Sequence, residues 1–208
     1  MSTHPPSPPS PASGGARRLV RTALIFYGLL LAAALAWRGG LAGESLLYAG
    51  PGSRAEGLDP LPDAALGATA AAAVIALSWV WTRRSAWGER LARALAGLLG
   101  RPTPGQIAVL ALASSVGEEA FFRGALQPRV GLVAASFVFG LAHFVPRREF
   151  LPWTAFSIAA GFLLGALFQA TGNLVAPVVT HALVNGVNLT LLTRRFGPPA
   201  DVPQQDHF

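Results

Sequence analysis

The stretch Ile107-Ala-Val-Leu-Ala-Leu-Ala-Ser-Ser-Val-Gly-Glu-Glu-Ala-Phe-Phe-Arg123 places two adjacent glutamates and an arginine inside an otherwise apolar segment. In a membrane span each such charge costs roughly 2.5–3.5 kcal/mol on insertion scales. Packing alone gives no reason to keep all three of them so close together. We therefore interpret Glu118 and Glu119 as candidates for a functional site inside a membrane.

The composition is that of an integral membrane protein. Of the 208 residues, 52% are hydrophobic and 12% are charged, whereas soluble domains carry about 25% charged residues. The net charge of +6 could suggest a nucleic-acid partner, but the basic residues, all arginines, lie at the ends of apolar runs, as membrane topology predicts. We therefore expect a lipid bilayer and no nucleic acid. The chain has no cysteine, which excludes disulfides and thiolate chemistry.

Six apolar segments are long enough to cross about 30 Å of hydrocarbon. They lie near residues 20–37, 64–82, 104–126, 130–146, 152–171 and 174–193. Only Gln127-Pro128-Arg129 separates the third from the fourth, and only Thr171-Gly172-Asn173 separates the fifth from the sixth, so each pair should form antiparallel neighbours. The predicted fold is all-α, a polytopic bundle of about six transmembrane helices.

The remaining segments flank this bundle. Residues 1–16 are rich in proline and serine, so we predict a disordered tail there and another at 197–208. The transmembrane domain is then 17–196, with a catalytic core at 104–190. Segment 87–99 places Leu91, Leu95, Leu98 and Leu99 on one helical face. It fits a short amphipathic helix at the membrane interface or, equally well, a connecting helix packed on the bundle.

The arginines predict the orientation. If the N-terminus is cytoplasmic, the cytoplasmic ends carry Arg17, Arg18, Arg21, Arg83, Arg84, Arg90, Arg93, Arg101, Arg147, Arg148, Arg194 and Arg195. Outside the membrane lie only Arg38, Arg54 and Arg129. This bias predicts that both termini are cytoplasmic. The short, all-arginine chain is typical of bacteria, so we expect a bacterial inner (plasma) membrane.

Helical spacing separates the charges of the third span into two roles. Glu119 and Arg123 are four residues apart and can form an ion pair, which is cheaper to bury than a lone charge. Glu118 is turned about 100° away from Glu119 and can face other helices. We predict a structural Glu119–Arg123 ion pair and a working Glu118, the alternative being that both glutamates only satisfy a buried polar network.

Polar residues on two further spans could join Glu118. His181 and Asn185 lie on one face of the last span and could stabilise an oxyanion together. His143 lies in the fourth span, which the tight hairpin holds beside the third. The sequence has no Gly-x-Ser-x-Gly and no His-Glu-x-x-His motif, which leaves water as the nucleophile. Glu118 would then act as the general base, with His143 orienting the water.

Spacing leaves other chemistries open. Glu118, His143 and His181 could instead hold Zn²⁺, with an open position for water. A non-catalytic immunity or scaffold protein could use the same cluster to bind a peptide or a membrane partner. A transporter or proton relay would also contain buried glutamate and histidine, but the sequence shows no inverted repeat of broken helices.

The polar motifs resemble those of a known family. Glu118-Glu119-Ala-Phe-Phe-Arg123 matches a Glu-Glu-x-x-x-Arg motif, Phe139-Gly-Leu-Ala-His143 matches Phe-x-x-x-His, and His181-Ala-Leu-Val-Asn185 matches His-x-x-x-Asn. Three such motifs, in this order on successive polar-bearing spans, resemble the CPBP (Abi) family of intramembrane proteases, which includes the CAAX prenyl endopeptidase. The resemblance covers about residues 104–190.

The resemblance implies hydrolysis of a peptide bond at the membrane by Glu118, His143, His181 and Asn185, in a peptide or membrane-protein substrate. Both metal-dependent and metal-free mechanisms are described for the family; we favour the metal-free one and expect no assured cofactor, with Zn²⁺ as the alternative. Because prenylated CAAX substrates belong to eukaryotes, we do not expect one here. The pair Gly161-x-x-x-Gly165 is interpreted as a close helix contact.

Overall fold

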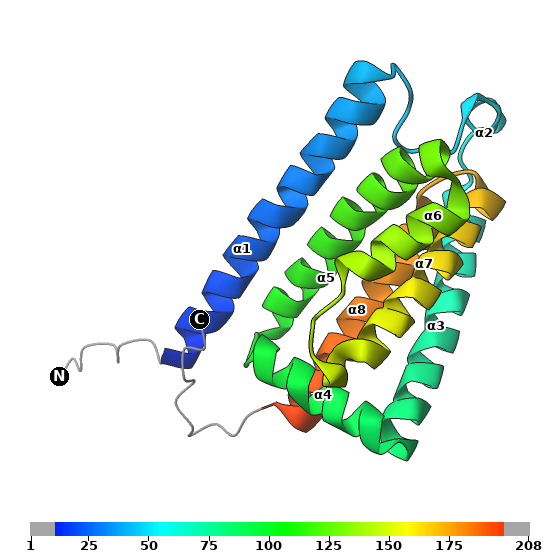
Figure 1. The fold of residues 1–208 in the computed structure, drawn as a ribbon. Coiled ribbons are helices and arrows are strands. Elements are labelled where there is room, and N and C mark those ends of the chain that lie inside the picture. The colour runs from blue at the N-terminus through cyan, green and yellow to red at the C-terminus, as the bar shows by residue number, and fades with distance from the viewer. Residues whose placement is uncertain (1–10, 198–208) are drawn as a thin grey trace, which may run out of the picture.

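The polar stretch lies at the centre of a helical bundle. The computed structural model describes residues 11–197. The long helices are α1 (Pro11–Ala34), α3 (Pro60–Arg84), α5 (Pro104–Glu119), α6 (Gln127–Ala142), α7 (Leu151–Thr171) and α8 (Val175–Phe196). Shorter elements join them: η1 (Leu35–Leu41), α2 (Pro51–Glu56), α4 (Ala86–Leu99), η2 (Ala120–Leu126) and η3 (Arg148–Phe150). Figure 1 shows these helices running side by side, with α4 across one end.

The predicted helical membrane bundle is confirmed, although the number of separate spans differs. Within residues 11–197, five helical stretches are long and apolar enough to cross a membrane: Gly15–Leu41, Pro60–Arg84, Pro104–Ala142, Arg148–Thr171 and Val175–Phe196. The third of them contains both the predicted third and fourth spans, because helical structure continues through the predicted break at Gln127-Pro128-Arg129. The protein is an integral membrane protein, and the third stretch holds two of the six predicted spans.

The reversal between these two segments occurs at Gly131 instead. Gly131 has φ 81° and ψ 168° inside α6, a conformation open to glycine and strained for other residues. Pro128 stands near the start of α6, which directly follows η2, three residues before Gly131. The predicted turn at residues 127–129 was therefore misplaced by a few residues, because the non-helical backbone is at Gly131.

The helix ends also adjust the predicted boundaries. Helix α1 begins at Pro11, so the last residues of the predicted tail, 11–16, are helical, and the transmembrane domain begins before residue 17. A proline is well tolerated in the first helical turn, which explains a helix start there. Residues 1–10 and 198–208, on which the rest of the predicted tails falls, lie outside the described part of the chain.

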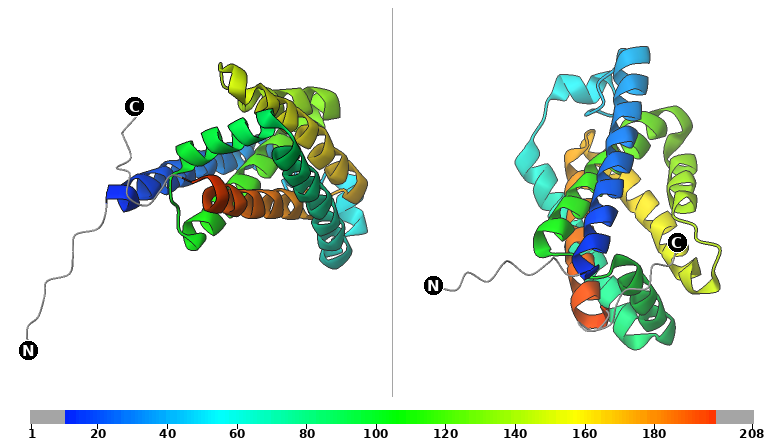
Figure 2. Two further views of the ribbon diagram at one scale, coloured as in Figure 1. Left: turned by 90° about the horizontal axis from the view of Figure 1, so that it is seen from below. Right: turned by 90° about the vertical axis from the view of Figure 1, so that its left-hand side faces the viewer.

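Helix α4 packs against the end of the bundle. Its Leu91, Ala92 and Ala96 are buried against neighbouring helices, chiefly α8 and α3. Its opposite side carries exposed Glu89, joined to Arg93 at 2.6 Å. Seen from below, α4 lies toward the viewer at this end of the bundle, and α1 extends to one side (Figure 2). Helix α1 packs on α5. The packed connecting helix is thus observed, and a position at the membrane interface remains a prediction.

Small residues let the long helices approach closely. A Cβ added at Gly67 of α3 would lie 2.5 Å from the carbonyl oxygen of Ala176 on α8. At the same crossing the hydroxyl of Thr180 donates to the carbonyl oxygen of Gly67 at 2.9 Å. In apolar surroundings such backbone contacts replace the hydrophobic effect as the source of helix association.

Replacing Gly67 by alanine should therefore push α3 away from α8. We expect Gly67→Ala to lower the free energy of unfolding by about 1–3 kcal/mol, the usual cost of overpacking. The measurement is thermal unfolding in a mild detergent. Gly28→Ala on α1 is the matched control, because a Cβ there meets nothing within 4 Å. Equal melting temperatures for the two variants would contradict the assigned crossing.

Candidate active site

The two glutamates lie where α5 passes into a π-helical turn. Glu118 and Glu119 are the last residues of α5, and η2 follows as a π-helix over Ala120–Leu126. The residue exposure is 6% for Glu118, 0% for Glu119 and 1% for Arg123. Single π-helical turns are rare and occur frequently at functional sites. All three charges of the stretch are therefore buried inside the bundle.

Glu119 is the centre of a buried polar cluster. Its Oε1 accepts a hydrogen bond from Nη1 of Arg123 at 3.0 Å, along the same helical stretch. The same oxygen lies 2.8 Å from Nδ1 of His181 on α8. The expected Glu119–Arg123 ion pair is thus present, but Glu119 also holds His181. The carboxylate of Glu119 therefore connects the Glu-Glu-x-x-x-Arg motif with the His-x-x-x-Asn motif.

Arg123 is held by groups from two further helices. Its Nη2 donates to the carbonyl oxygen of Gly161 on α7 at 3.2 Å. Its guanidinium lies over the ring of Phe139 on α6, 4.2 Å from the ring centroid. Such cation–π contacts strengthen when desolvated. A single buried side chain therefore ties η2, α6 and α7 together around the site.

Both histidines turn the same ring nitrogen toward Glu118. Nδ1 of His143 lies 2.8 Å from the carbonyl oxygen of Phe139, which can only accept, so this nitrogen carries the proton. Nδ1 of His181 is engaged by Glu119. The Nε2 atoms then face Oε2 of Glu118, at 3.7 Å for His143 and 4.0 Å for His181. Fixing one ring nitrogen in this way sets the tautomer and the orientation of the other.

Glu118 has one carboxylate oxygen free for chemistry. Its Oε2 is buried and has no hydrogen-bond partner among the described residues. Both Nε2 distances exceed the length of a direct hydrogen bond. A buried acceptor without a partner is costly and needs an explanation. At these separations one small polar group beside the three atoms could hydrogen-bond to more than one of them.

Asn185 lies one helical turn from His181 and has a different partner. Its Nδ2 donates to Oγ of Ser114 on α5 at 3.0 Å. Asn185 is partly buried, and its amide nitrogen has a second hydrogen to donate. The structure thus brings Glu118, Glu119, His143 and His181 into one cluster and places Asn185 beside it, bonded to the helix that carries the glutamates.

Helix α1 contributes a residue that the sequence did not reveal. The side chain of Tyr27 lies beside the carboxylate of Glu118. The helices are close at this point, because a Cβ at Gly117 would lie 2.8 Å from the carbonyl oxygen of Tyr27. A tyrosine in an apolar run is common near membrane interfaces, so the sequence alone gave no reason to place it at the site.

Two motif residues also have roles that were not foreseen. The ring of Phe139 lies between charged and titratable groups, with its centroid 4.7 Å from that of His143. Gly161 was interpreted as a packing residue, and a Cβ there would indeed meet the carbonyl oxygen of Ser136 at 2.8 Å. The missing side chain also exposes its own carbonyl to Arg123. The spacing of residues in the sequence does not reveal a hydrogen bond to a backbone carbonyl, so this role of Gly161 could not be predicted.

The side chains of the cluster are of the types that bind Zn²⁺, but they are not arranged as a zinc site. Two imidazole nitrogens and a carboxylate are ligands that Zn²⁺ accepts. Among residues 11–197, however, no group of three histidines, aspartates or glutamates is arranged to hold a metal ion. We therefore derive no chemical step through a metal.

Comparison with known proteins agrees with this cluster. Residues 101–187 match the family described as type II CAAX prenyl endopeptidase Rce1-like. The matched segment is less than half of the 208-residue chain. It contains all three polar motifs, from Glu118 to Asn185. The matched family is described as one of endopeptidases, so the segment is similar in sequence to CAAX-protease-like enzymes.

One curated relative extends the comparison. The chain is 39% identical over 83 residues to the uncharacterized protein YpbD of Bacillus subtilis (strain 168). The match covers 39% of this chain and 42% of YpbD, so the chain spans less than half of that relative. No solved structure matches the chain. The Rce1-like match covers residues 101–187, and helix α1 with Tyr27 lies outside it.

The buried Glu119–Arg123 ion pair can be compared with the exposed Glu89–Arg93 pair, which has the same four-residue spacing. The comparison tests how much the buried pair contributes to stability. Arg123→Gln leaves Glu119 buried without its charged partner, which should cost about 3–5 kcal/mol of stability. Arg93→Gln removes an equivalent pair with Glu89 at the surface, where such pairs contribute up to about 1 kcal/mol. Chemical denaturation of both variants in detergent is the measurement. The assigned role of Arg123 is wrong if the two variants lose the same stability.

Proposed function

We propose that this protein is an intramembrane endopeptidase that hydrolyses a peptide bond with a water activated by Glu118. The observation that carries the proposal is the convergence of three atoms: the partnerless Oε2 of Glu118 and the Nε2 atoms of His143 and His181, at 3.7 and 4.0 Å from it. The Rce1-like match over residues 101–187 supports a protease function.

In the proposed first step a water lies between Glu118 and His143. Oε2 of Glu118 accepts its proton as the oxygen attacks the carbonyl carbon of the scissile peptide. Nε2 of His143 accepts a hydrogen bond from the other hydrogen of the water and so orients the attacking oxygen. This role requires an unprotonated Nε2, which agrees with Nδ1 of His143 donating to the carbonyl of Phe139.

The second step requires donors to the tetrahedral oxyanion. His181 would supply Nε2–H when its ring carries both protons, and Glu119 at 2.8 Å balances the charge of that imidazolium. Asn185 would supply the amide hydrogen that Ser114 does not use. Glu118 then delivers its proton to the leaving nitrogen, which breaks the peptide bond and restores the carboxylate.

The substrate in this proposal is a peptide or a membrane-protein segment that reaches a buried site. The catalytic carboxylate is 6% exposed, so the bond must enter the bundle. We further propose that the protein lies in a bacterial inner membrane with both termini cytoplasmic. The orientation rests on where the arginines lie. Arginine pairs are found in the last turns of α3 and α8 and just before α7.

Glu118→Gln should abolish cleavage while the protein still folds. An amide has nearly the shape of the carboxylate but cannot take the proton, so we expect a rate loss of about 10²–10⁴-fold. The assay reconstitutes the purified protein in liposomes with a panel of single-span reporter proteins and detects new termini by mass spectrometry.

Glu89→Gln is the control, since Glu89 lies on the exposed face of α4. A biological effect that survives Glu118→Gln and His143→Ala, with no cleavage in any variant, would favour the non-catalytic binding role instead.

Tyr27→Phe tests the contribution of helix α1. Removing a hydroxyl that can hydrogen-bond to a charged group should lower kcat by about tenfold and leave KM nearly unchanged, because Tyr27 lies beside Glu118. Phe26→Leu is the neighbouring control, as Phe26 is 56% exposed. A kcat equal to that of the parent enzyme in Tyr27→Phe would remove Tyr27 from the site.

A further inference from the structure

An apolar groove lies on the bundle away from the glutamates. Helices α3 and α7 each pack on α8, and the space among these helices and α4 has a volume of about 560 Å³. Its walls include Leu77 and Trp81 on α3, Ala160 and Leu163 on α7, and Leu191 on α8. The lining is almost entirely hydrocarbon and aromatic, and α4 closes one end.

The volume decides what kind of apolar group the groove can hold. A helix of about 10–12 Å diameter that rises 1.5 Å per residue occupies on the order of 120–170 Å³ per residue. The groove would therefore hold about four helical residues, too few for a transmembrane helix that needs about 20. A single extended hydrocarbon chain suits this volume better, since ligand pockets of about 300–1,000 Å³ enclose small molecules.

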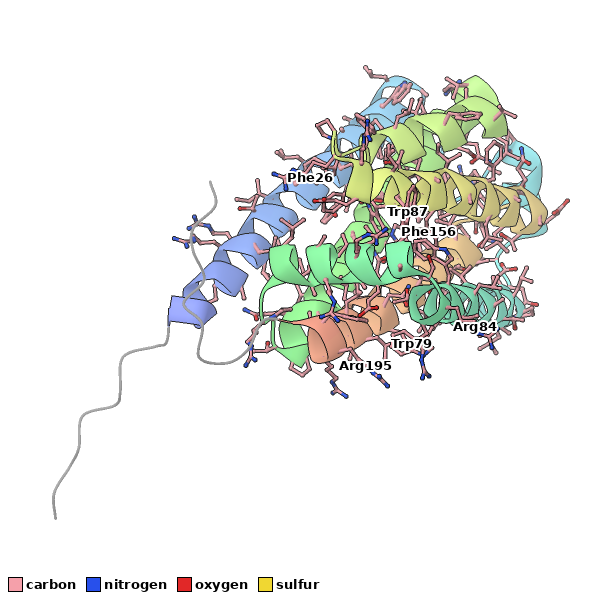
Figure 3. The ribbon with its side chains drawn as sticks, turned by 60° about the horizontal axis from the view of Figure 1, so that its bottom comes forward. Phe26, Trp79, Arg84, Trp87, Phe156 and Arg195 are labelled. Carbon is pink, nitrogen blue, oxygen red and sulfur yellow. The ribbon has the colours of Figure 1, made fainter. Side chains whose placement is uncertain are left out.

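The charges at the closed end indicate what the hydrocarbon chain is attached to. The guanidinium of Arg195 lies over the ring of Trp79, 5.3 Å from its centroid, and Trp79 lines the groove. Figure 3 shows Arg84, at the end of α3, on the same side as Trp79 and Arg195. Both arginines are exposed. The carboxylate of Glu89 on α4 is already paired with Arg93.

We propose that this groove binds one anionic phospholipid. One acyl chain lies between α3 and α7 against Trp81 and Leu163, and the headgroup phosphate lies at Arg84 and Arg195 beside Trp79. Guanidinium groups match phosphate geometry, and indole rings favour the headgroup level of a membrane. This lipid site is separate from the hydrolytic site and does not depend on it.

The groove nevertheless reaches the edge of the hydrolytic site. Trp153 lines the groove, and its ring centroid is 5.9 Å from that of His143. Its ring also stacks on Phe156, a second groove residue, at 5.9 Å. A lipid chain in the groove would therefore contact the residue that packs against His143.

Native mass spectrometry of the purified full chain tests the proposal. The probes are phosphatidylglycerol and phosphatidylcholine at equal concentrations in a neutral detergent. We expect one tightly held phosphatidylglycerol per chain. Ala160→Trp fills the groove and should remove this adduct, whereas Ala72→Trp, at an exposed position of α3 outside the groove, should keep it. Retention of the adduct by Ala160→Trp would overturn the assigned site.

A second pair of variants tests the headgroup without altering the interior. Arg84→Gln combined with Arg195→Gln should lower the preference for phosphatidylglycerol over phosphatidylcholine by roughly tenfold. Arg54→Gln, an exposed arginine on α2, should leave the preference unchanged. An unchanged preference in the double variant, or no preference in the parent protein, would overturn the assigned headgroup. An unchanged preference in Arg54→Gln would show that the loss of a positive charge elsewhere on the protein does not by itself lower the preference for phosphatidylglycerol.

Discussion

The buried carboxylate of Glu119 is the constraint on which the rest of this structure depends. At 0% exposure it has no water to solvate it, and a lone ionised group there would cost several kcal/mol. Arg123 at 3.0 Å and His181 at 2.8 Å meet that requirement from two different helical segments. Glu119 therefore makes the polar site compatible with a membrane, and it also sets the orientation of a histidine that faces Glu118.

Glycines make this arrangement possible. Arg123 reaches the carbonyl of Gly161, and Gln127 reaches the carbonyl of Gly165 one turn farther along α7. Side chains at these glycines would collide with α6 and with Gln127. The glycine pair thus has two effects, since it brings helices together and opens their backbone carbonyls to polar side chains. The close helix packing and the hydrogen bonds to Arg123 and Gln127 therefore both depend on the missing Cβ atoms of these glycines.

The site also extends beyond the segment that resembles known proteases. Tyr27 comes from α1, far before residue 101 where the Rce1-like match begins. Gly117 brings α1 close enough for this contact. A helix outside the matched region therefore completes the surroundings of Glu118. The apolar groove likewise uses α3 and α4 together with α7 and α8, so the first hundred residues both support the polar cluster and shape the lipid-facing surface.

The sequence by itself determined that the chain is a helical membrane bundle, because apolar runs of that length have no other stable arrangement in hydrocarbon. It also predicted Glu118, His143 and His181 as candidate site residues, since polar residues in such runs are too costly to keep without a use, and the structure places these three side chains close together. Periodicity along single helices could not determine which helices meet. The turn at Gly131, the hydrogen bond from Arg123 to Gly161 and the approach of Tyr27 to Glu118 depend on backbone conformation and on contacts between distant segments. Only the tertiary structure decided these, because close packing fixes distances that spacing along one helix leaves free.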